Sequence, residues 1–229
     1  MTGDDYKNGQ VVLIDKPLEW TSFQAVNKIR WHIRKRFAIK KIKVGHAGTL
    51  DPLATGLLII CTGKQTKNIS TFQGQIKEYT GTITLGATTP SYDLESEIDY
   101  TFPINHITTE LVHETTKQFT GTIQQRPPIF SALKKDGKRL YELARKGERV
   151  DIPMREITIS EFEITNLHEN NLDFRVVCSK GTYIRSLAHD FGKALNSGAH
   201  LSALRRTKIG NFSVHNAETI DSFIQKIEM

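Results

Sequence analysis

Five consecutive apolar residues at 57–61 (Leu-Leu-Ile-Ile-Cys) constrain the fold of this chain more than any other segment. A short apolar run without polar positions, flanked by glycines, is typical of a strand buried on both faces. It is far shorter than the roughly 20 residues that cross a bilayer. The acidic start of the chain, residues 1–5, lacks the basic and apolar parts of a secretion signal. We therefore expect a soluble, cytoplasmic protein with a buried sheet.

Strand-like and helix-like patterns are mixed along the chain without a regular βαβ order. A capping box at Thr21–Gln24 predicts a helix whose apolar positions are Phe23, Val26, Ile29, Ile33 and Phe37. The other predicted strands cover 11–14, 76–85, 155–166, 172–178 and 208–214, and the other helices 63–67, 108–119, 184–195 and 217–227. Loops are expected at 45–56 and 88–107. Residues 120–150 are interpreted as a strand, a projecting loop and a short helix near 138–146. The mixture favours an α+β class, and without repeats or linkers we expect one domain over residues 1–229.

Charge is segregated along the sequence. Residues 28–43 hold eight Lys or Arg and no acid, and residues 126–149 hold eight against three acids. Between them, residues 91–114 hold six acids and no Lys or Arg. Such segregation, with a net charge of +6, favours a polyanion-binding face. The alternative is that helices here merely have solvated outer faces.

The two cysteines, Cys61 and Cys178, both lie in apolar stretches and form no CxxC pair. Buried, reduced thiols are the expected state. The eight histidines show no HxxxH spacing, so no metal site is expected.

The segment Gly45 to Pro52 (Gly-His-Ala-Gly-Thr-Leu-Asp-Pro) carries the best candidate for chemistry. Its glycines allow tight turns, and Pro52 favours an extended backbone at Asp51. The Asp51 carboxylate would thus sit on a stiff loop between apolar stretches, as a catalytic acid, base or nucleophile requires. The structural alternative is an aspartate that only hydrogen-bonds loop amides.

Three further segments add candidates. Arg185, where residues 179–185 turn from a strand into a helix, could pair with a buried carboxylate or lie on the surface. Tyr79, on a strand, could stack on a base or transfer a proton, or be a core residue. The basic stretch 126–147, with Phe130 and Tyr141 interleaved, suits phosphate contacts and stacking, or forms an exposed hairpin.

Taken together, these segments resemble the TruB family of tRNA pseudouridine synthases. Residues 45–58 resemble the catalytic motif of that family, and residues 63–67, 126–147, 179–185 and 204–210 match further family segments in the same order. The resemblance covers about residues 9–214. It implies the pseudouridine synthase fold, with a mixed, mostly antiparallel sheet and an RNA-gripping insertion at about 124–152.

The resemblance also implies an activity. Uridine 55 in the T loop of tRNA would be flipped out and isomerised to pseudouridine without cofactor or metal. Asp51 would be the catalytic carboxylate, acting as nucleophile or base. Residues implied to line the pocket are Tyr79, Tyr183, Arg185, Leu204 and His46, with Arg185 as the ion-pair partner of Asp51. Lys16 and Pro17 would support the catalytic loop. RNA contacts are expected from Lys64, Arg126, Lys134, Lys135, Lys138, Arg139, Arg145, Arg205 and Arg206.

The chain departs from many family members at its end, where only 19 residues follow Gly210. We expect a short form without the C-terminal PUA-type RNA-binding domain, working as a monomer on the T arm of tRNA. One alternative is a guide-dependent synthase within an RNA–protein particle, against which the absent domain argues. Another is a non-catalytic tRNA binder. A role in tRNA folding alongside catalysis also fits.

Overall fold

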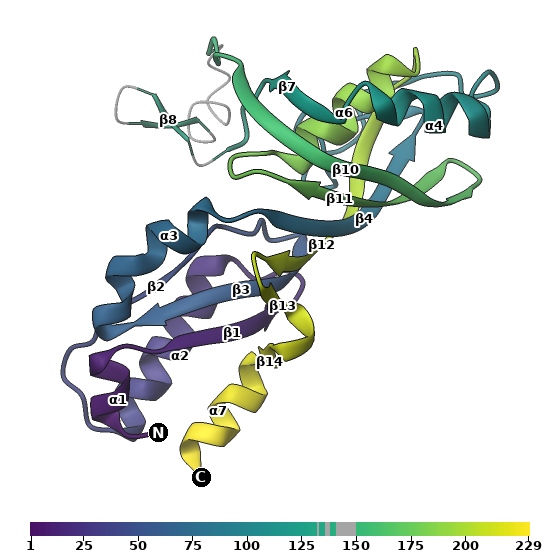
Figure 1. Ribbon diagram of the computed structural model, residues 1–229. Helices are drawn as coiled ribbons and strands as arrows, with labels where there is room; N and C mark the ends of the chain where they lie inside the picture. The colour runs from purple at the N-terminus through teal and green to yellow at the C-terminus, as the bar shows by residue number, and fades with distance from the viewer. Residues whose placement is uncertain (132, 136–137, 141–149) are drawn as a thin grey trace. The chain divides into compact units, whose positions relative to one another are not determined.

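The computed structural model describes residues 1–131, 133–135, 138–140 and 150–229. Contacts divide the chain into two compact units: unit 1 comprises Met1–Tyr79 and Leu204–Met229, and unit 2 comprises Thr80–Ala203. Two strands, β4 (Lys77–Leu85) and β12 (Ala199–Ile209), each contribute residues to both units (Figure 1). None of the helices in the described ranges is long and apolar enough to span a membrane.

Unit 1 is built on the apolar run at 57–61, which lies in β3 (Ala54–Thr62). β3 pairs antiparallel with β1 (Val11–Lys16) and with β2 (Val44–His46), and parallel with β12. Two short strands complete the unit: β14 (Glu218–Thr219) runs parallel to β1, and β13 (Phe212–Ser213) pairs with β12. The sheet is therefore mixed.

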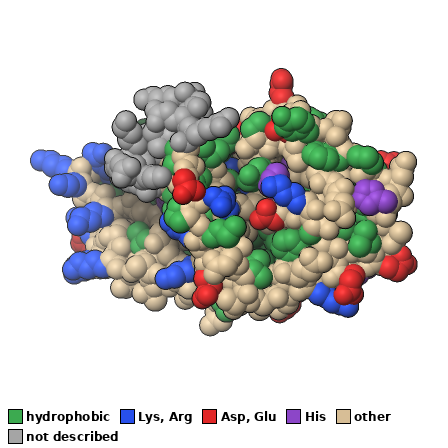
Figure 2. Space-filling view, turned by 90° about the horizontal axis from the view of Figure 1, so that it is seen from above, with side chains coloured by type: hydrophobic (Ala, Val, Ile, Leu, Met, Phe, Trp, Pro, Cys, Tyr) green, Lys and Arg blue, Asp and Glu red, His purple; other side chains and the backbone are tan. Residues whose placement is uncertain are grey.

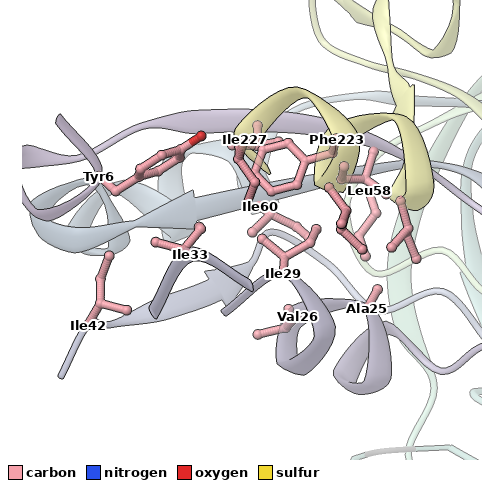
Figure 3. Close-up of a cluster of buried hydrophobic side chains, with 14 of the residues drawn as sticks. Tyr6, Ala25, Val26, Ile29, Ile33, Ile42, Leu58, Ile60, Phe223 and Ile227 are labelled. Carbon is pink, nitrogen blue, oxygen red and sulfur yellow. The ribbon is translucent and has the colours of Figure 1, made fainter. Parts of the chain in front are cut away.

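Both faces of β3 are buried, as the sequence predicted. Leu58 and Ile60 belong to one apolar cluster, and Leu57, Ile59 and Cys61 to another. The first cluster packs β3 against α1 (Gly3–Asn8), α2 (Ser22–Arg36) and α7 (Ile220–Glu228) (Figure 3). The second includes residues of α3 (Ile69–Gly74) and of the 3₁₀ helix η2 (Val214–Asn216). A further 3₁₀ helix, η1 (Gly63–Asn68), follows β3 directly.

The capping box predicted for α2 is confirmed. The Thr21 hydroxyl accepts from the Gln24 amide at 3.1 Å, and the Gln24 side chain accepts from the Thr21 amide at 2.8 Å. Val26 and Ile33 are buried as predicted, but Phe23 is 65% exposed. Although Phe23 is among the apolar positions of the helix, it sits beside the buried face, which includes Ser22 and Ala25.

Unit 2 contains an antiparallel arrangement of β7 (Gly121–Gln125), β10 (Arg155–His168) and β11 (Asn171–Cys178), with β4 next in the strand order. Two helices, α4 (Thr109–Lys117) and α6 (Ile184–Ala194), pack on one face (Figure 1). Edge contacts between Phe119, Phe162, Phe174 and Phe191 fill the space beneath them. Two small hairpins complete the unit: β5 (Ala87–Thr88) with β6 (Tyr100–Thr101), and β8 (Lys134–Lys135) with β9 (Lys138–Arg139).

The structure corrects three sequence predictions. The strand predicted at 208–214 is instead β12 at Ala199–Ile209, followed by the separate β13. The predicted loop at 45–56 is shortened to residues 47–53, because β2 extends to His46 and β3 begins at Ala54. Residues 138–139 form a strand where a helix was predicted, while 141–149 lie outside the described residues. Cys61 and Cys178 are both buried as reduced thiols, as expected.

Candidate functional site

Asp51 lies in unit 1, in the loop between β2 and β3, and it is half-buried. Because β2 and β3 pair antiparallel, with His46 opposite Ile60, this loop closes a hairpin. Its backbone is held at both ends: Ala47 N donates to Ile59 O (2.9 Å), and Ala54 N donates to Asp51 O (3.1 Å). In its middle, Ser22 of α2 both accepts from Leu50 N (2.8 Å) and donates to Leu50 O (3.1 Å). The stiff mounting that the sequence indicated is thus present.

Arg206 of β12 also holds the backbone of the Asp51 loop through hydrogen bonds. Its guanidinium donates to Leu57 O (2.8 Å), Gly48 O (3.1 Å) and Thr49 O (3.4 Å), and only 1% of the residue is exposed. This burial contradicts the predicted RNA contact, because phosphate oxygens cannot reach a guanidinium already enclosed by the protein. Arg206 is a structural residue that supports the Asp51 loop.

Lys16 is also fully buried, with Nζ donating to Pro17 O (2.8 Å), Trp20 O (2.6 Å) and Pro52 O (3.5 Å). It therefore joins the turn after β1 to the residue that follows Asp51, which is the geometry a supporting role requires. Burial lowers the pKa of Lys16 to about 8; the Asp51 carboxylate opposes this shift and Arg206 adds to it. Asp51 thus has a buried cation in its electrostatic surroundings.

Two predicted pocket residues flank the Asp51 loop. Leu204 of β12 pairs with Ala54, three residues after Asp51. His46 immediately precedes the loop, and its Nδ1 is buried without a hydrogen-bond partner among the described residues. The pKa of His46 is lowered, chiefly by burial, with a smaller contribution from Arg206 and an opposing one from a hydrogen bond to the Gly48 backbone. Burial therefore favours the neutral form of His46.

Tyr79 lies in the part of β4 that belongs to unit 1, and it is buried. Its strand follows β12 in the strand order, and neighbouring Glu78 accepts from Thr207 Oγ1 at 2.8 Å. Burial agrees with both interpretations of this tyrosine, as a core residue and as a pocket residue.

Arg185 and Tyr183 lie in unit 2, at the start of α6. Arg185 is 5% exposed, and its guanidinium donates to Phe130 O (2.9 Å) and Ser91 O (3.2 Å). Its Nε lies 3.6 Å from Oδ2 of the buried Asp93. The expected pairing of Arg185 with Asp51 would join the two units and stays a prediction.

Sequence reasoning missed Asp93, which it counted only as one charge of an acidic stretch. This carboxylate also accepts from Glu95 N at 3.0 Å, and the preceding Tyr92 has φ +64°, a left-handed conformation that bulky residues rarely adopt. The short polar run Thr89–Asp93 before an acidic loop was the available signal.

The backbone of Tyr183 is held by hydrogen bonds. Its N–H donates to Gln125 Oε1 (2.8 Å), and Gln125 Nε2 donates to the Tyr183 carbonyl (3.1 Å). Because Gln125 ends β7 and is itself buried, this reciprocal pair fixes the position from which α6 begins.

The predicted RNA-binding residues fall into different environments. Arg205 forms two hydrogen bonds with the Asp15 carboxylate, at 3.0 and 2.6 Å. Arg126 is half-exposed and contacts Asp151 at 3.4 Å, and Lys64 donates to Asn8 at 3.1 Å. Lys134, Lys135, Lys138 and Arg139 lie in the β8–β9 hairpin, and only their backbone is described; Arg145 lies outside the described residues. On the face shown in Figure 2, Lys and Arg side chains gather most densely at the left edge.

No group of three or more His, Cys, Asp or Glu side chains that could hold a metal ion occurs within the described ranges.

Comparison of the whole chain with solved structures identifies the class of fold. A Cbf5–Nop10–Gar1 complex matches with a TM-score of 0.73 and 28% identity, over 98% of this chain and 56% of that one. An H/ACA RNP bound to a substrate RNA containing 2′-deoxyuridine matches with a TM-score of 0.69 and 26% identity, over 97% of this chain and 54% of that one. The chain has the pseudouridine synthase fold.

The particular family follows from sequence models. The model for TruB family pseudouridylate synthase (N terminal domain) matches residues 34–184, and that for the tRNA pseudouridylate synthase B C-terminal domain matches 185–228. The tRNA pseudouridine synthase B of Flavobacterium johnsoniae is 65% identical over all of both chains. That of Phocaeicola vulgatus is 58% identical over 96% of this chain and 93% of its own. The chain belongs to the TruB family of pseudouridylate synthases.

Proposed function

We propose that this enzyme converts uridine 55 in the T loop of tRNA to pseudouridine, with Asp51 as the catalytic carboxylate. The observation that carries the proposal is the 65% identity, without truncation of either chain, to a tRNA pseudouridine synthase B. The geometry of the Asp51 loop supports it, because Ser22, Arg206 and Lys16 hold the backbone of the loop that carries the half-buried Asp51.

The reaction is an isomerisation, so it needs no co-reactant. The bond between C1′ of the ribose and N1 of uracil breaks, the uracil turns, and a bond from C1′ to C5 forms. The proton leaves C5, and N1 ends protonated. A base stacked inside the T loop must first be extruded, which costs a few kcal/mol and is offset by phosphate contacts to basic side chains.

In this proposal Asp51 contacts the extruded nucleotide, and both a nucleophilic and a basic role suit a carboxylate. Tyr79 stacks on the base and helps to remove the C5 proton. Arg185 pairs with Asp51 and keeps it ionised. Tyr183 and Leu204 line the pocket, and His46 organises the T loop of the tRNA. Lys16 and Pro17 position Asp51 without touching substrate.

The competing proposal is a guide-dependent synthase, since the structural matches include Cbf5 and H/ACA complexes. Identity to those chains is 28% or less, against 65% for the tRNA pseudouridine synthase B. The difference in identity favours a reaction on tRNA that needs no guide RNA. We place this reaction in the cytoplasm. Assistance of tRNA folding is proposed as an accompanying role.

The decisive experiment is incubation of the purified chain with an unmodified T-arm stem-loop and with full-length tRNA, followed by mapping of pseudouridine. We expect product at position 55 without cofactor, metal or guide RNA. Asp51→Asn should give none, whereas the same change at the exposed Asp221 should leave the rate unaltered. Full activity of Asp51→Asn would contradict the mechanism, and an inactive wild type on tRNA would favour a non-catalytic binder.

A further inference from the structure

Five lysines from three segments of unit 1 surround one open cavity of about 280 Å³, which we call the lysine pocket. Lys7 lies in the last turn of α1, Lys41 and Lys43 precede β2, and Lys64 and Lys67 lie in η1. All five are exposed, and the lining that the structure describes includes no Asp or Glu. A concentration of positive charge without interspersed acids is typical of an anion-binding surface.

The backbone of unit 1 brings these three segments together. Gly63 N donates to Lys43 O at 2.8 Å, and Thr62 Oγ1 donates to Tyr6 O at 2.9 Å. Gly63 itself has φ +50°, and a Cβ there would lie 2.1 Å from the Lys7 carbonyl oxygen. Because only glycine allows this approach, the lysines of α1 and η1 meet as a consequence of the fold. The floor is fixed by Ile42, which is buried in the apolar cluster beneath.

The charge in the lysine pocket is largely uncompensated among the described residues. Lys7 lies 3.2 Å from the exposed Asp4, and Lys64 donates to the neutral Asn8. Like charges around one cavity repel one another, and a bound polyanion removes that repulsion. The volume is below the roughly 300–1,000 Å³ typical of small-molecule pockets, so surface contact with a polymer suits it better than enclosure of a metabolite.

The lysine pocket and Asp51 lie at opposite ends of β3. Asp51 precedes Ala54, where the strand starts, and Gly63 follows Thr62, where it ends. Ala54 and Thr62, the two ends of β3, are eight steps apart, which is roughly 26 Å at about 3.3 Å per residue. About eight base pairs of B-form duplex cover that distance. An A-form RNA duplex, which rises less per base pair, needs more, and a single nucleotide does not reach.

We propose that the lysine pocket binds the phosphate backbone of tRNA outside the reacting loop, as a second contact at a fixed distance from Asp51. The inference rests on the proposed function, which supplies tRNA as the substrate. The lysine pocket would add affinity only for an RNA long enough to reach both the pocket and Asp51. The reaction itself would take place at Asp51.

The test compares Lys41→Gln/Lys67→Gln with a control of equal charge change, Lys117→Gln/Lys226→Gln. The control lysines are exposed and already paired with Glu114 and Glu218. Binding of full-length tRNA is measured between 50 and 200 mM salt. The pocket variant should raise Kd on the order of tenfold at 0.1 M salt and lower the salt slope by roughly 1–2, since each lost phosphate contact removes about 0.9. The loss should appear in KM rather than in kcat.

A hairpin cut to the loop and about three base pairs is too short to span the two sites. The pocket variant and the control should bind that hairpin equally well. Unchanged tRNA affinity in the pocket variant, or an equal loss on the short hairpin, would overturn the proposal. Saturation of the pocket by inorganic phosphate with no effect of the substitutions on tRNA would also overturn it, and would indicate a small-anion site. An inactive wild type that still binds tRNA would instead count against the proposed function alone.

Discussion

The guanidinium of Arg206 donates to the carbonyl oxygen of Gly48 at 3.1 Å, which ties the Asp51 loop to a strand more than 150 residues later in the sequence. The same guanidinium bonds Leu57 and Thr49. A charged side chain used in this way contributes through geometry, because three carbonyls converge on one planar group.

Replacing Arg206 should therefore damage both stability and activity. In Arg206→Met three carbonyls, of which that of Leu57 is buried, lose their donor, and we expect a loss of about 3 kcal/mol in the free energy of unfolding. The relaxed loop should lower kcat roughly 100-fold, as a shift of about 1 Å does in a positioned site. Denaturant unfolding and single-turnover kinetics measure the two effects. Arg206→Lys keeps the charge but not the planar fork, so near-normal kcat in that variant would contradict the geometric role.

Lys16 should make stability depend on pH in the alkaline range. Its folded pKa of about 8 lies below the ordinary 10.5, so the folded state binds fewer protons than the unfolded state between these values. Stability attributable to Lys16 is therefore lowest below pH 8 and rises as pH increases from 8 to 10.5. Relative to Lys16→Met, the wild type should gain about 1–3 kcal/mol across that window in denaturant unfolding. Parallel curves for the two proteins would show that Lys16 is not desolvated.

His189 should make the stability of the protein depend on pH in the acidic range. Its ring stacks on Tyr92 with centroids 3.8 Å apart, and burial lowers its pKa to about 4. The folded state thus binds fewer protons than the unfolded state between pH 4 and 6.5, and stability falls as pH falls through this window. His189→Phe retains a stacking ring without a titrating group. We expect its acid unfolding midpoint to lie at lower pH than that of the wild type, measured by circular dichroism; coincident midpoints would refute the assignment.

The basic stretch in the predicted insertion supplies a fourth prediction, which rests on the sequence alone. Charge reversal at Lys134, Lys135 and Lys138 should weaken tRNA binding and flatten its salt dependence. The matched control reverses Lys117, Lys193 and Lys226, which are exposed elsewhere. Equal affinities of the two triple variants, measured by filter binding at several salt concentrations, would exclude a gripping role.

Local patterns in the sequence were sufficient for several features of this protein. The capping box at Thr21 and Gln24 depends on residues three positions apart, and the buried strand at 57–61 depends on uninterrupted apolarity. The glycines and Pro52 indicated a stiff loop at Asp51, although Ser22, Lys16 and Arg206 from other segments hold its backbone. The capping box and the apolar run can be read within a few residues, without knowing the partner segments.

Only the tertiary structure decided the features that depend on distant partners. Residues 204–206 of β12 pair with β3, although the mixed polar sequence of β12 shows no strand alternation. Arg206 resembles a surface charge in the sequence, yet carbonyls from another segment enclose it. Asp93 is notable because the guanidinium of Arg185 lies beside it. The five lysines of the lysine pocket come together because Gly63 allows α1 and η1 to approach closely. Burial and charge pairing are properties of neighbours in space, which residue type and spacing alone do not determine.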